Sequence, residues 1–279
     1  MVIKSPLIRQ RLARCGSYLG LTILAIIVGF PLYVIFADSL MSLKEIASSP
    51  PAIFPLHPLW STYRDAWVGG NLGRYLVVSV LQTALIVAGQ VLTSVVAAFA
   101  FAFCEFPFKR TIFVTMLATS MIPFEVTVTA NLQTMASFHL TSTLPALVLP
   151  FLATGFGIFL LRQAFLQIPK EMHEAAVIDG YSAWSFLWKI AVPLARPAIA
   201  ALCVFSFLGA WNQYLWPLVE MGSNTSIETI QLAIKGVGGT ISMANISLAA
   251  AAIAVAPLLI LLVFFQKHLI RSLTAGAVK

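Results

Sequence analysis

Long stretches without a charged side chain alternate with short polar segments along the chain. No Asp, Glu, Lys or Arg occurs within residues 17–37, 75–104, 126–161, 197–219 or 236–266. A helix of about 20 apolar residues can cross the hydrocarbon core of a bilayer. Because every stretch reaches that length, the pattern predicts an integral membrane protein built of helices.

The same pattern predicts six membrane-spanning helices. We expect them at about 17–40, 73–104, 110–135, 144–166, 195–219 and 245–267. They form one domain, 17–267, between an N-terminal segment, 1–16, and a C-terminal tail, 268–279. The N-terminus is basic and then apolar, like a signal peptide, but its apolar stretch is long and no clear small-residue cleavage site follows. We therefore interpret it as a retained first span.

The distribution of positive charge predicts the orientation of these spans, because cytoplasmic loops are enriched in Lys and Arg. With both termini in the cytoplasm, thirteen of the seventeen Lys and Arg residues lie on the cytoplasmic side and four lie outside. This orientation places a polar segment, 167–194, in the cytoplasm between the fourth and fifth spans.

Composition supports the membrane assignment. The chain is 59% hydrophobic and only 10% charged, whereas soluble domains are usually about 25% charged. The net charge of +7 is therefore interpreted as a determinant of topology, and nucleic-acid binding is not expected. The three cysteines, Cys15, Cys104 and Cys203, have no spacing typical of a disulfide or a metal site.

The cytoplasmic segment has the local signals of two short helices. Pro169 suits the first turn of a helix, and Gly180 is placed to end that helix in a left-handed conformation. Ser182 can cap a second helix, which carries Trp184 and Trp188. Local physics leaves open an ordinary interfacial loop whose aromatic side chains rest on lipid headgroups.

One motif in this segment resembles a known family. Glu174-Ala175-Ala176 is followed after three residues by Gly180, and after nine more by Ile190-Ala191-Val192-Pro193. This spacing resembles the EAA motif of ABC-importer permeases, E-A-A-x3-G-x9-I-x-L-P, with Val192 as the single departure. The resemblance implies an all-α integral membrane fold, the six-helix transmembrane domain of a type I ABC importer with cytoplasmic coupling helices.

The resemblance also implies which residues meet a cytoplasmic ATPase. These coupling residues are Glu174, Ala175, Ala176, Asp179, Gly180, Trp184 and Pro193. The sequence has no G-x4-G-K-[ST] motif and no Gly-Lys pair, so ATP and Mg²⁺ are expected on the partner and no cofactor or catalytic residue in this chain. The implied partners are a second homologous permease, two ABC ATPase subunits and an extracytoplasmic substrate-binding protein, in a bacterial cytoplasmic (inner) membrane.

Other stretches narrow the resemblance to one kind of importer. The segments "RDAW", "FAFCEFPFK" and "WNQYLWPLV" are similar to permeases of the carbohydrate-uptake type. The stretch "MIPFEVTVTA" is most similar to the smaller permease for glycerol-3-phosphate and glycerophosphodiesters such as glycerophosphocholine. The alternatives are an oligosaccharide or sugar permease of the same mechanism and an ion-coupled secondary transporter. An intramembrane enzyme would need a catalytic set that the sequence does not contain.

Polar residues within the predicted spans are candidates for the substrate pathway. Glu125 lies inside the third span, where a carboxylate is costly and usually faces a cavity or a partner. Trp211, Asn212, Gln213 and Tyr214 combine amide hydrogen-bonding groups with aromatic faces. A structural ion pair for Glu125 and an interfacial aromatic belt for the second group remain alternatives. His173-Glu174 lacks the second histidine of H-E-x-x-H, so no metal site is expected.

Overall fold

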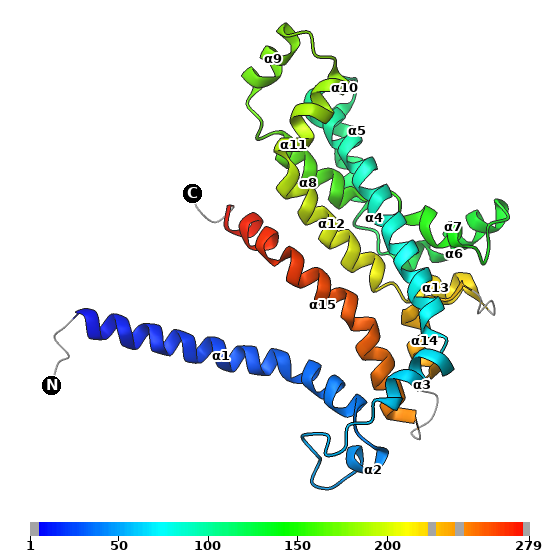
Figure 1. Ribbon diagram of the computed structural model, residues 1–279. Coiled ribbons are helices and arrows are strands. Elements are labelled where there is room, and N and C mark those ends of the chain that lie inside the picture. The colour runs from blue at the N-terminus through cyan, green and yellow to red at the C-terminus, as the bar shows by residue number, and fades with distance from the viewer. Residues whose placement is uncertain (1–5, 223–226, 238–242, 276–279) are drawn as a thin grey trace. The chain divides into compact units, whose positions relative to one another are not determined.

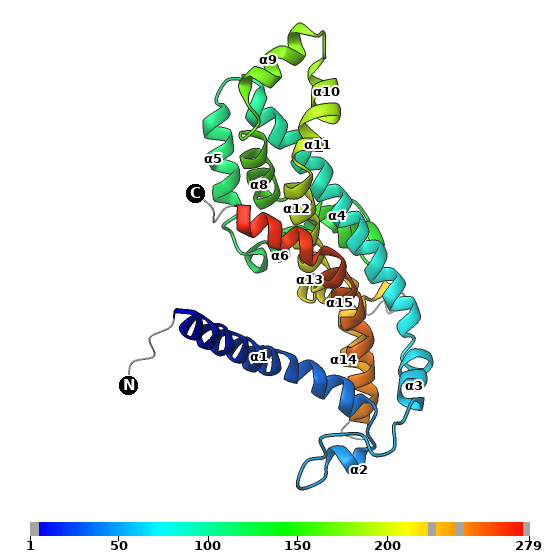
Figure 2. The same cartoon turned by 60° about the vertical axis from the view of Figure 1, so that its left-hand side comes forward.

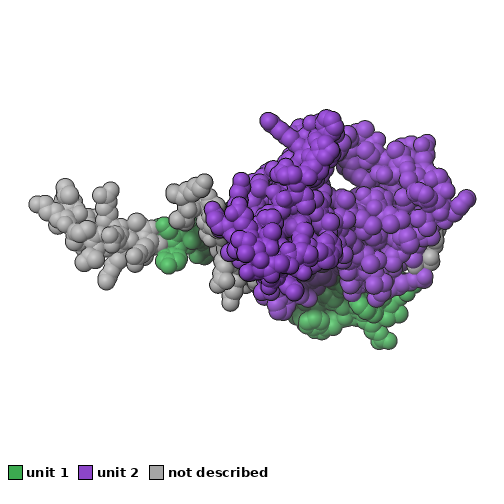
Figure 3. Space-filling view, turned by 90° about the horizontal axis from the view of Figure 1, so that it is seen from above, with its two compact units in different colours: residues 1–72, 234–253 green, residues 73–233, 254–279 purple. Residues whose placement is uncertain are grey.

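The computed structural model describes residues 6–222, 227–237 and 243–275, and the side chains within 16–265 of these ranges (Figure 1). Within this described part all regular elements are helical. Two compact units are distinguished (Figure 3): unit 1 contains residues 1–72 and 234–253, and unit 2 contains residues 73–233 and 254–279.

Unit 1 is built around the first long helix and the loop that follows it. Its helices are α1 (Pro6–Ser39), α2 (Leu43–Ile46), α3 (Ser61–Gly69), the end of α14 (Ile230–Val237) and the start of α15 (Ala244–Ala275). The Ser39 hydroxyl lies 2.8 Å from the Tyr63 hydroxyl, and the Asn245 amide donates to the Met41 carbonyl at 3.2 Å. At α2, hydrogen bonds from Ser42 hold the pKa of Glu45 below its usual range.

Unit 2 contains the other helices. They are α4 (Leu72–Phe103), α5 (Lys109–Thr119), α6 (Phe124–Ser137), α7 (Leu144–Val148), η1 (Leu149–Phe151), α8 (Gly155–Phe165), α9 (Lys170–Ile178), α10 (Ala183–Phe186), a π-helical turn η2 (Leu187–Ala191), α11 (Val192–Leu194), α12 (Arg196–Trp211) and α13 (Leu215–Met221). The core joins the end of α4 to α8, α9, α10 and α12 through side chains that include Phe99, Phe165 and Phe186. In two views, α9 and α10 lie at the end of the unit where α4 ends and α5 begins (Figures 1 and 2).

The structure breaks the helices predicted at 110–135 and 144–166, and within 195–219 it interrupts the helix before Pro217, a residue that can kink or end a helix. A bend of 99° separates α5 from α6, and one of 47° separates η1 from α8. Pro123 immediately precedes α6, and proline cannot donate the backbone hydrogen bond that would continue a helix. Near 212–214 the helix stops because the ring of Pro217 would clash with the carbonyl four residues earlier.

Three helical stretches are long and apolar enough to cross a membrane. Within the described residues these are Gly16–Ser39, Leu72–Phe103 and Ala244–Phe265. Three bent pairs raise the number to six if each pair is one span. The last pair bends by 78° between α11 and α12. The chain therefore changes direction at the point where segment 167–194 ends and the predicted fifth span begins. The membrane crossings themselves stay a prediction.

Candidate functional site

The polar segment 167–194 forms two short helices with a glycine corner between them. Gly180 has φ +77°, the left-handed conformation that the sequence predicts. The Gly180 N–H donates to the Val177 carbonyl at 3.0 Å, and the Tyr181 N–H donates to the Ala176 carbonyl at 2.9 Å. These are the two hydrogen bonds of a Schellman cap. Ser182 caps α10 by accepting a backbone N–H of its first turn at 3.2 Å.

Aromatic side chains hold this segment on the end of α4. The His173 ring stacks on Phe103, with 5.2 Å between centroids, and lies 4.7 Å from the ring of Phe186. Phe186 is 1% exposed and lies 5.2 Å from Phe103 in an edge-to-face pair. Aromatic pairs of this geometry contribute about 0.5–1.5 kcal/mol each beyond their buried area. The segment is therefore fastened at a helix end and is not a free loop.

The outer face of the segment carries most of the predicted coupling residues. Those exposed there are Glu174, Ala175, Asp179, Gly180 and Trp184. Ile178 is 85% exposed and lies between them. Ala176 differs, because it is 4% exposed and packs into the core under the segment. Ala176 therefore does not lie on the surface where both alanines were expected, while contact of the exposed Ala175 with a partner stays a prediction. Pro193 is partly buried in the first turn of α11.

Glu125 lies at a helix break and not in the middle of a helix. It occupies the first turn of α6, immediately after the 99° bend. A carboxylate is favoured there by the unpaired N–H groups and the dipole of the helix. The side chain is exposed and has no hydrogen bond or ion pair with other described residues. The adjacent Phe124 ring packs edge-to-face on Trp216, with 5.7 Å between centroids.

The side chains of the predicted group 211–214 do not line one common site, because they differ in burial and in hydrogen-bond partners. Trp211 is 2% exposed, and its indole N–H donates to the Ala254 carbonyl at 3.2 Å. The Gln213 side-chain carbonyl accepts from the amide of buried Gln82 at 2.8 Å. Asn212 is exposed and donates to the Leu208 carbonyl. Tyr214 is partly buried. Of the four residues, Asn212 is the one with an exposed side chain, while Trp211 and Gln213 make interhelical contacts.

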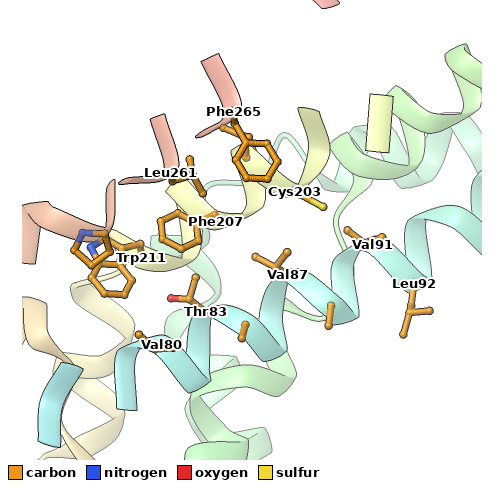
Figure 4. Close-up of a pocket in the computed structure, with 14 residues that line it drawn as sticks. Val80, Thr83, Val87, Val91, Leu92, Cys203, Phe207, Trp211, Leu261 and Phe265 are labelled. Atoms are coloured by element: carbon orange, nitrogen blue, oxygen red, sulfur yellow. The ribbon is translucent and has the colours of Figure 1, made fainter. Parts of the chain in front are cut away.

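Trp211 closes one end of an apolar cavity of about 550 Å³ between α4, α12 and α15. Figure 4 shows Val87 and Thr83 on α4 facing Phe207 and Leu261 across it. Trp211 and Phe207 stack with 5.6 Å between ring centroids. Apolar walls of this kind favour hydrocarbon over a hydrophilic solute, so this cavity does not resemble a sugar site.

A second cavity is lined by hydroxyl side chains that are not among the pathway residues predicted from the sequence. It measures about 520 Å³ and lies at the α5–α6 and η1–α8 breaks. Its polar side chains are Thr119, Ser120, Thr127 and Thr154. The start of α8 and the end of α5 can approach closely here because residue 155 is glycine: a Cβ at this position would lie 2.3 Å from the Ser120 hydroxyl oxygen. Prolines mark both helix breaks in the sequence: Pro123 stands at the end of the α5–α6 break, and Pro150 lies in η1 before the break that leads to α8.

Glu220 is a buried acid that the sequence analysis also missed, one residue beyond the predicted fifth span. It is 4% exposed, and one carboxylate oxygen accepts from the Ser142 N–H at 3.2 Å. The other oxygen has no hydrogen-bond partner in the described part of the chain. Glu220 thus ties α13 to the loop before α7.

Comparisons with known proteins agree with the motif. Residues 90–275 match the family described as "Binding-protein-dependent transport system inner membrane component". A relative from Agrobacterium fabrum (strain C58 / ATCC 33970) is 33% identical over 272 residues, 94% of this chain and 96% of the relative. One from Yersinia pestis bv. Antiqua (strain Antiqua) is 31% identical over 268 residues, 92% and 94% of the two chains. Both are named "sn-glycerol-3-phosphate transport system permease protein UgpE".

A solved structure has the same fold. It is described as "Crystal structure of a bacterial ABC transporter involved in the import of the acidic polysaccharide alginate". The TM-score is 0.82 at 20% identity, over 96% of this chain and 99% of that chain. The fold is therefore that of a type I importer transmembrane domain. Together with the family match, these findings show that the chain belongs to the binding-protein-dependent transport system inner membrane components, the multi-pass permease subunits of ABC importers.

Proposed function

We propose that this permease carries glycerol-3-phosphate or glycerophosphodiesters, such as glycerophosphocholine, into the cytoplasm. The observation that carries the proposal is the 33% identity, over 94% of the chain, to a permease named for sn-glycerol-3-phosphate transport. An oligosaccharide remains the competing substrate class.

The proposed mechanism rests on the outer face of segment 167–194. Two ABC ATPase subunits bind ATP and Mg²⁺ and dock on Glu174, Ala175 and the exposed side chains around Gly180. ATP-driven closure of the ATPase pair moves the segment, which moves α4 through the Phe103–His173 contact. The spans then change from an inward-open to an outward-open state, and an extracytoplasmic binding protein delivers the solute. Coupling requires the ATP-bound ATPases to bind this segment differently from the resting ones.

The proposed pathway includes Glu125, which has no partner among the described residues. Its carboxylate can accept hydrogen bonds from glycerol hydroxyls or attract a choline cation, but it does not favour a bare phosphate. The exposed Asn212 amide offers both donors and acceptors to the same solute. A second, homologous permease subunit completes the pathway, and both termini face the cytoplasm.

Transport by the reconstituted complex tests the substrate class. The permease pair, the ATPases and the binding protein are placed in proteoliposomes, and uptake of labelled glycerol-3-phosphate, glycerophosphocholine and a maltooligosaccharide is compared. We expect ATP-dependent uptake of the first two. An ATPase variant that cannot hydrolyse ATP serves as the control and should abolish uptake. Preferential uptake of the oligosaccharide would contradict the substrate, and uptake without ATP would contradict the mechanism.

A further inference from the structure

Three cationic side chains surround a cavity at the turn between α4 and α5. The cavity measures about 530 Å³ and is lined by Lys109, Arg110 and Arg162, together with Phe101, Phe113 and other residues. It is separate from the coupling segment and from the two cavities described above, and the proposed transport mechanism does not use it.

The guanidinium of Arg162 is held in place while its terminal nitrogens stay available. Its Nε–H donates to the Phe101 carbonyl at 3.2 Å. Its flat face lies over the Phe113 ring, 4.3 Å from the centroid. No other hydrogen bond or ion pair of Arg162 occurs within the described residues. A fixed guanidinium with free terminal N–H groups matches the geometry of phosphate oxygens.

The other charges around the cavity do not cancel. Lys109 donates to the Cys104 carbonyl at 2.8 Å and lies 3.5 Å from the Glu105 carboxylate, whose side chain is 93% exposed. Arg110 is exposed and has no ion pair with the part of the chain that the structure describes. Three cations therefore face one acid, Glu105, which also lines the cavity but has a highly exposed side chain. The cavity attracts an anion.

The surroundings of the cavity are apolar on the side of α5. Val114 lines the cavity and is 56% exposed, and Ile112 on the same helix is 48% exposed. Phe108, at the turn itself, is 78% exposed. Cations next to exposed hydrocarbon side chains at a helix end are typical of a membrane interface, where basic pockets between helices bind anionic headgroups.

We propose that this cavity binds the phosphate diester of an anionic phospholipid, with Arg162 and Arg110 as its principal ligands. The lipid chains then lie along the exposed side of α5. Inorganic phosphate and glycerol-3-phosphate also carry a phosphate anion that these side chains could bind. The experiment must therefore distinguish a lipid from a soluble phosphate.

Native mass spectrometry of the intact transport complex tests the proposal. Detergent-purified complex is titrated with phosphatidylglycerol or with phosphatidylcholine, and retained lipid adducts are counted. The double variant Arg110→Gln/Arg162→Gln should bind phosphatidylglycerol about tenfold more weakly than the wild type, because two cations near an anionic headgroup are lost. Phosphatidylcholine carries the same phosphate diester but has no net charge, so it should bind more weakly and lose less affinity in the variant. Arg196→Gln removes an exposed charge elsewhere and should behave as the wild type.

A single variant keeps the test valid if the double variant does not fold. Arg110→Gln alone removes an exposed side chain that has no ion pair among the described residues, and it should weaken phosphatidylglycerol binding about threefold. Inorganic phosphate and glycerol-3-phosphate form the soluble arm. Equal phosphatidylglycerol binding by the wild type and Arg110→Gln would overturn the proposal. Arg110-dependent binding of the soluble anions without any of the lipid would overturn the assignment to a phospholipid.

Discussion

The imidazole of His173 stacks on the ring of Phe103, with 5.2 Å between centroids and an angle of 28° between planes. His173 belongs to α9, immediately before the coupling motif, and Phe103 is the last residue of α4. A force applied to the outer face of α9 therefore reaches a 32-residue helix through packed rings. In the proposed mechanism, this contact transmits movement of the docking face to α4.

Replacing Phe103 with Ala should uncouple ATP hydrolysis from uptake. The change removes ring contacts with His173 and Phe186; since Phe103 is partly buried, the loss of stability should be smaller than the roughly 3–5 kcal/mol of a fully buried aromatic side chain. ATP hydrolysis and uptake are measured on the same proteoliposomes, and uptake per ATP should fall severalfold. Phe138→Ala, at a residue 64% exposed, is the matched control. Unchanged uptake per ATP would exclude this path of coupling.

Gly180 is expected to tolerate asparagine better than valine. A Cβ at this position meets nothing within 4 Å, so the cost comes from φ +77° alone. The left-handed region costs roughly 1–2 kcal/mol for an ordinary residue and more for a β-branched one, while Asn adopts it more readily. Uptake should therefore decrease in the order Gly, Asn, Val. Gly209→Ala, which has equal space and no positive φ, should leave uptake intact. Equal activity of Val and Asn would show that the corner is not needed.

The Gln82–Gln213 hydrogen bond should behave as a coupled pair in thermal unfolding. Gln213→Leu leaves the buried Gln82 amide without its acceptor at 2.8 Å, and an unsatisfied buried group costs about 1–3 kcal/mol. Adding Gln82→Leu should recover part of that loss. Strict additivity of the two single variants would contradict a direct interaction.

Glu125→Gln tests the polar residue of the proposed pathway. If the carboxylate meets a choline cation, uptake of glycerophosphocholine should fall more than uptake of glycerol-3-phosphate. If it accepts hydroxyl hydrogen bonds, both should fall by similar factors, since one hydrogen bond to a charged group contributes about 1.5–3 kcal/mol. An ion pair with the second permease would instead lower the thermal stability of the complex without changing selectivity. Unchanged uptake and stability would remove Glu125 from the pathway.

The features predicted correctly from the sequence are local ones. The left-handed Gly180 and the cap at Ser182 depend on residues within one or two turns, so their signals are complete in a short stretch. The inward position of Ala176 and the hydrogen bond from Trp211 to Ala254 depend on helices distant in sequence. Hydrophobicity alone could not place them.

The helix breaks show a second limit of prediction from the hydrophobic pattern. Pro217 marks a possible helix end in the sequence, but the apolar pattern alone predicts one helix across 110–135 in spite of Pro123. Proline shows that a break is possible, and the tertiary environment decides its size, here 99° between α5 and α6. The position of Glu125 follows from that bend, because it converts a mid-helix acid into a residue of a helix first turn.

The most direct test of ATPase docking compares Glu174→Lys with Glu171→Lys. Both acids are exposed on α9, and only Glu174 belongs to the motif. Reversing a charge at an interface costs roughly 2–5 kcal/mol when a cation faces it. The complexes are purified, and the amount of retained ATPase and the ATP-driven uptake are measured together. We expect Glu174→Lys to lose uptake more than tenfold and Glu171→Lys to resemble the wild type. Normal uptake and normal ATPase retention in Glu174→Lys would contradict the docking of an ATPase on this face.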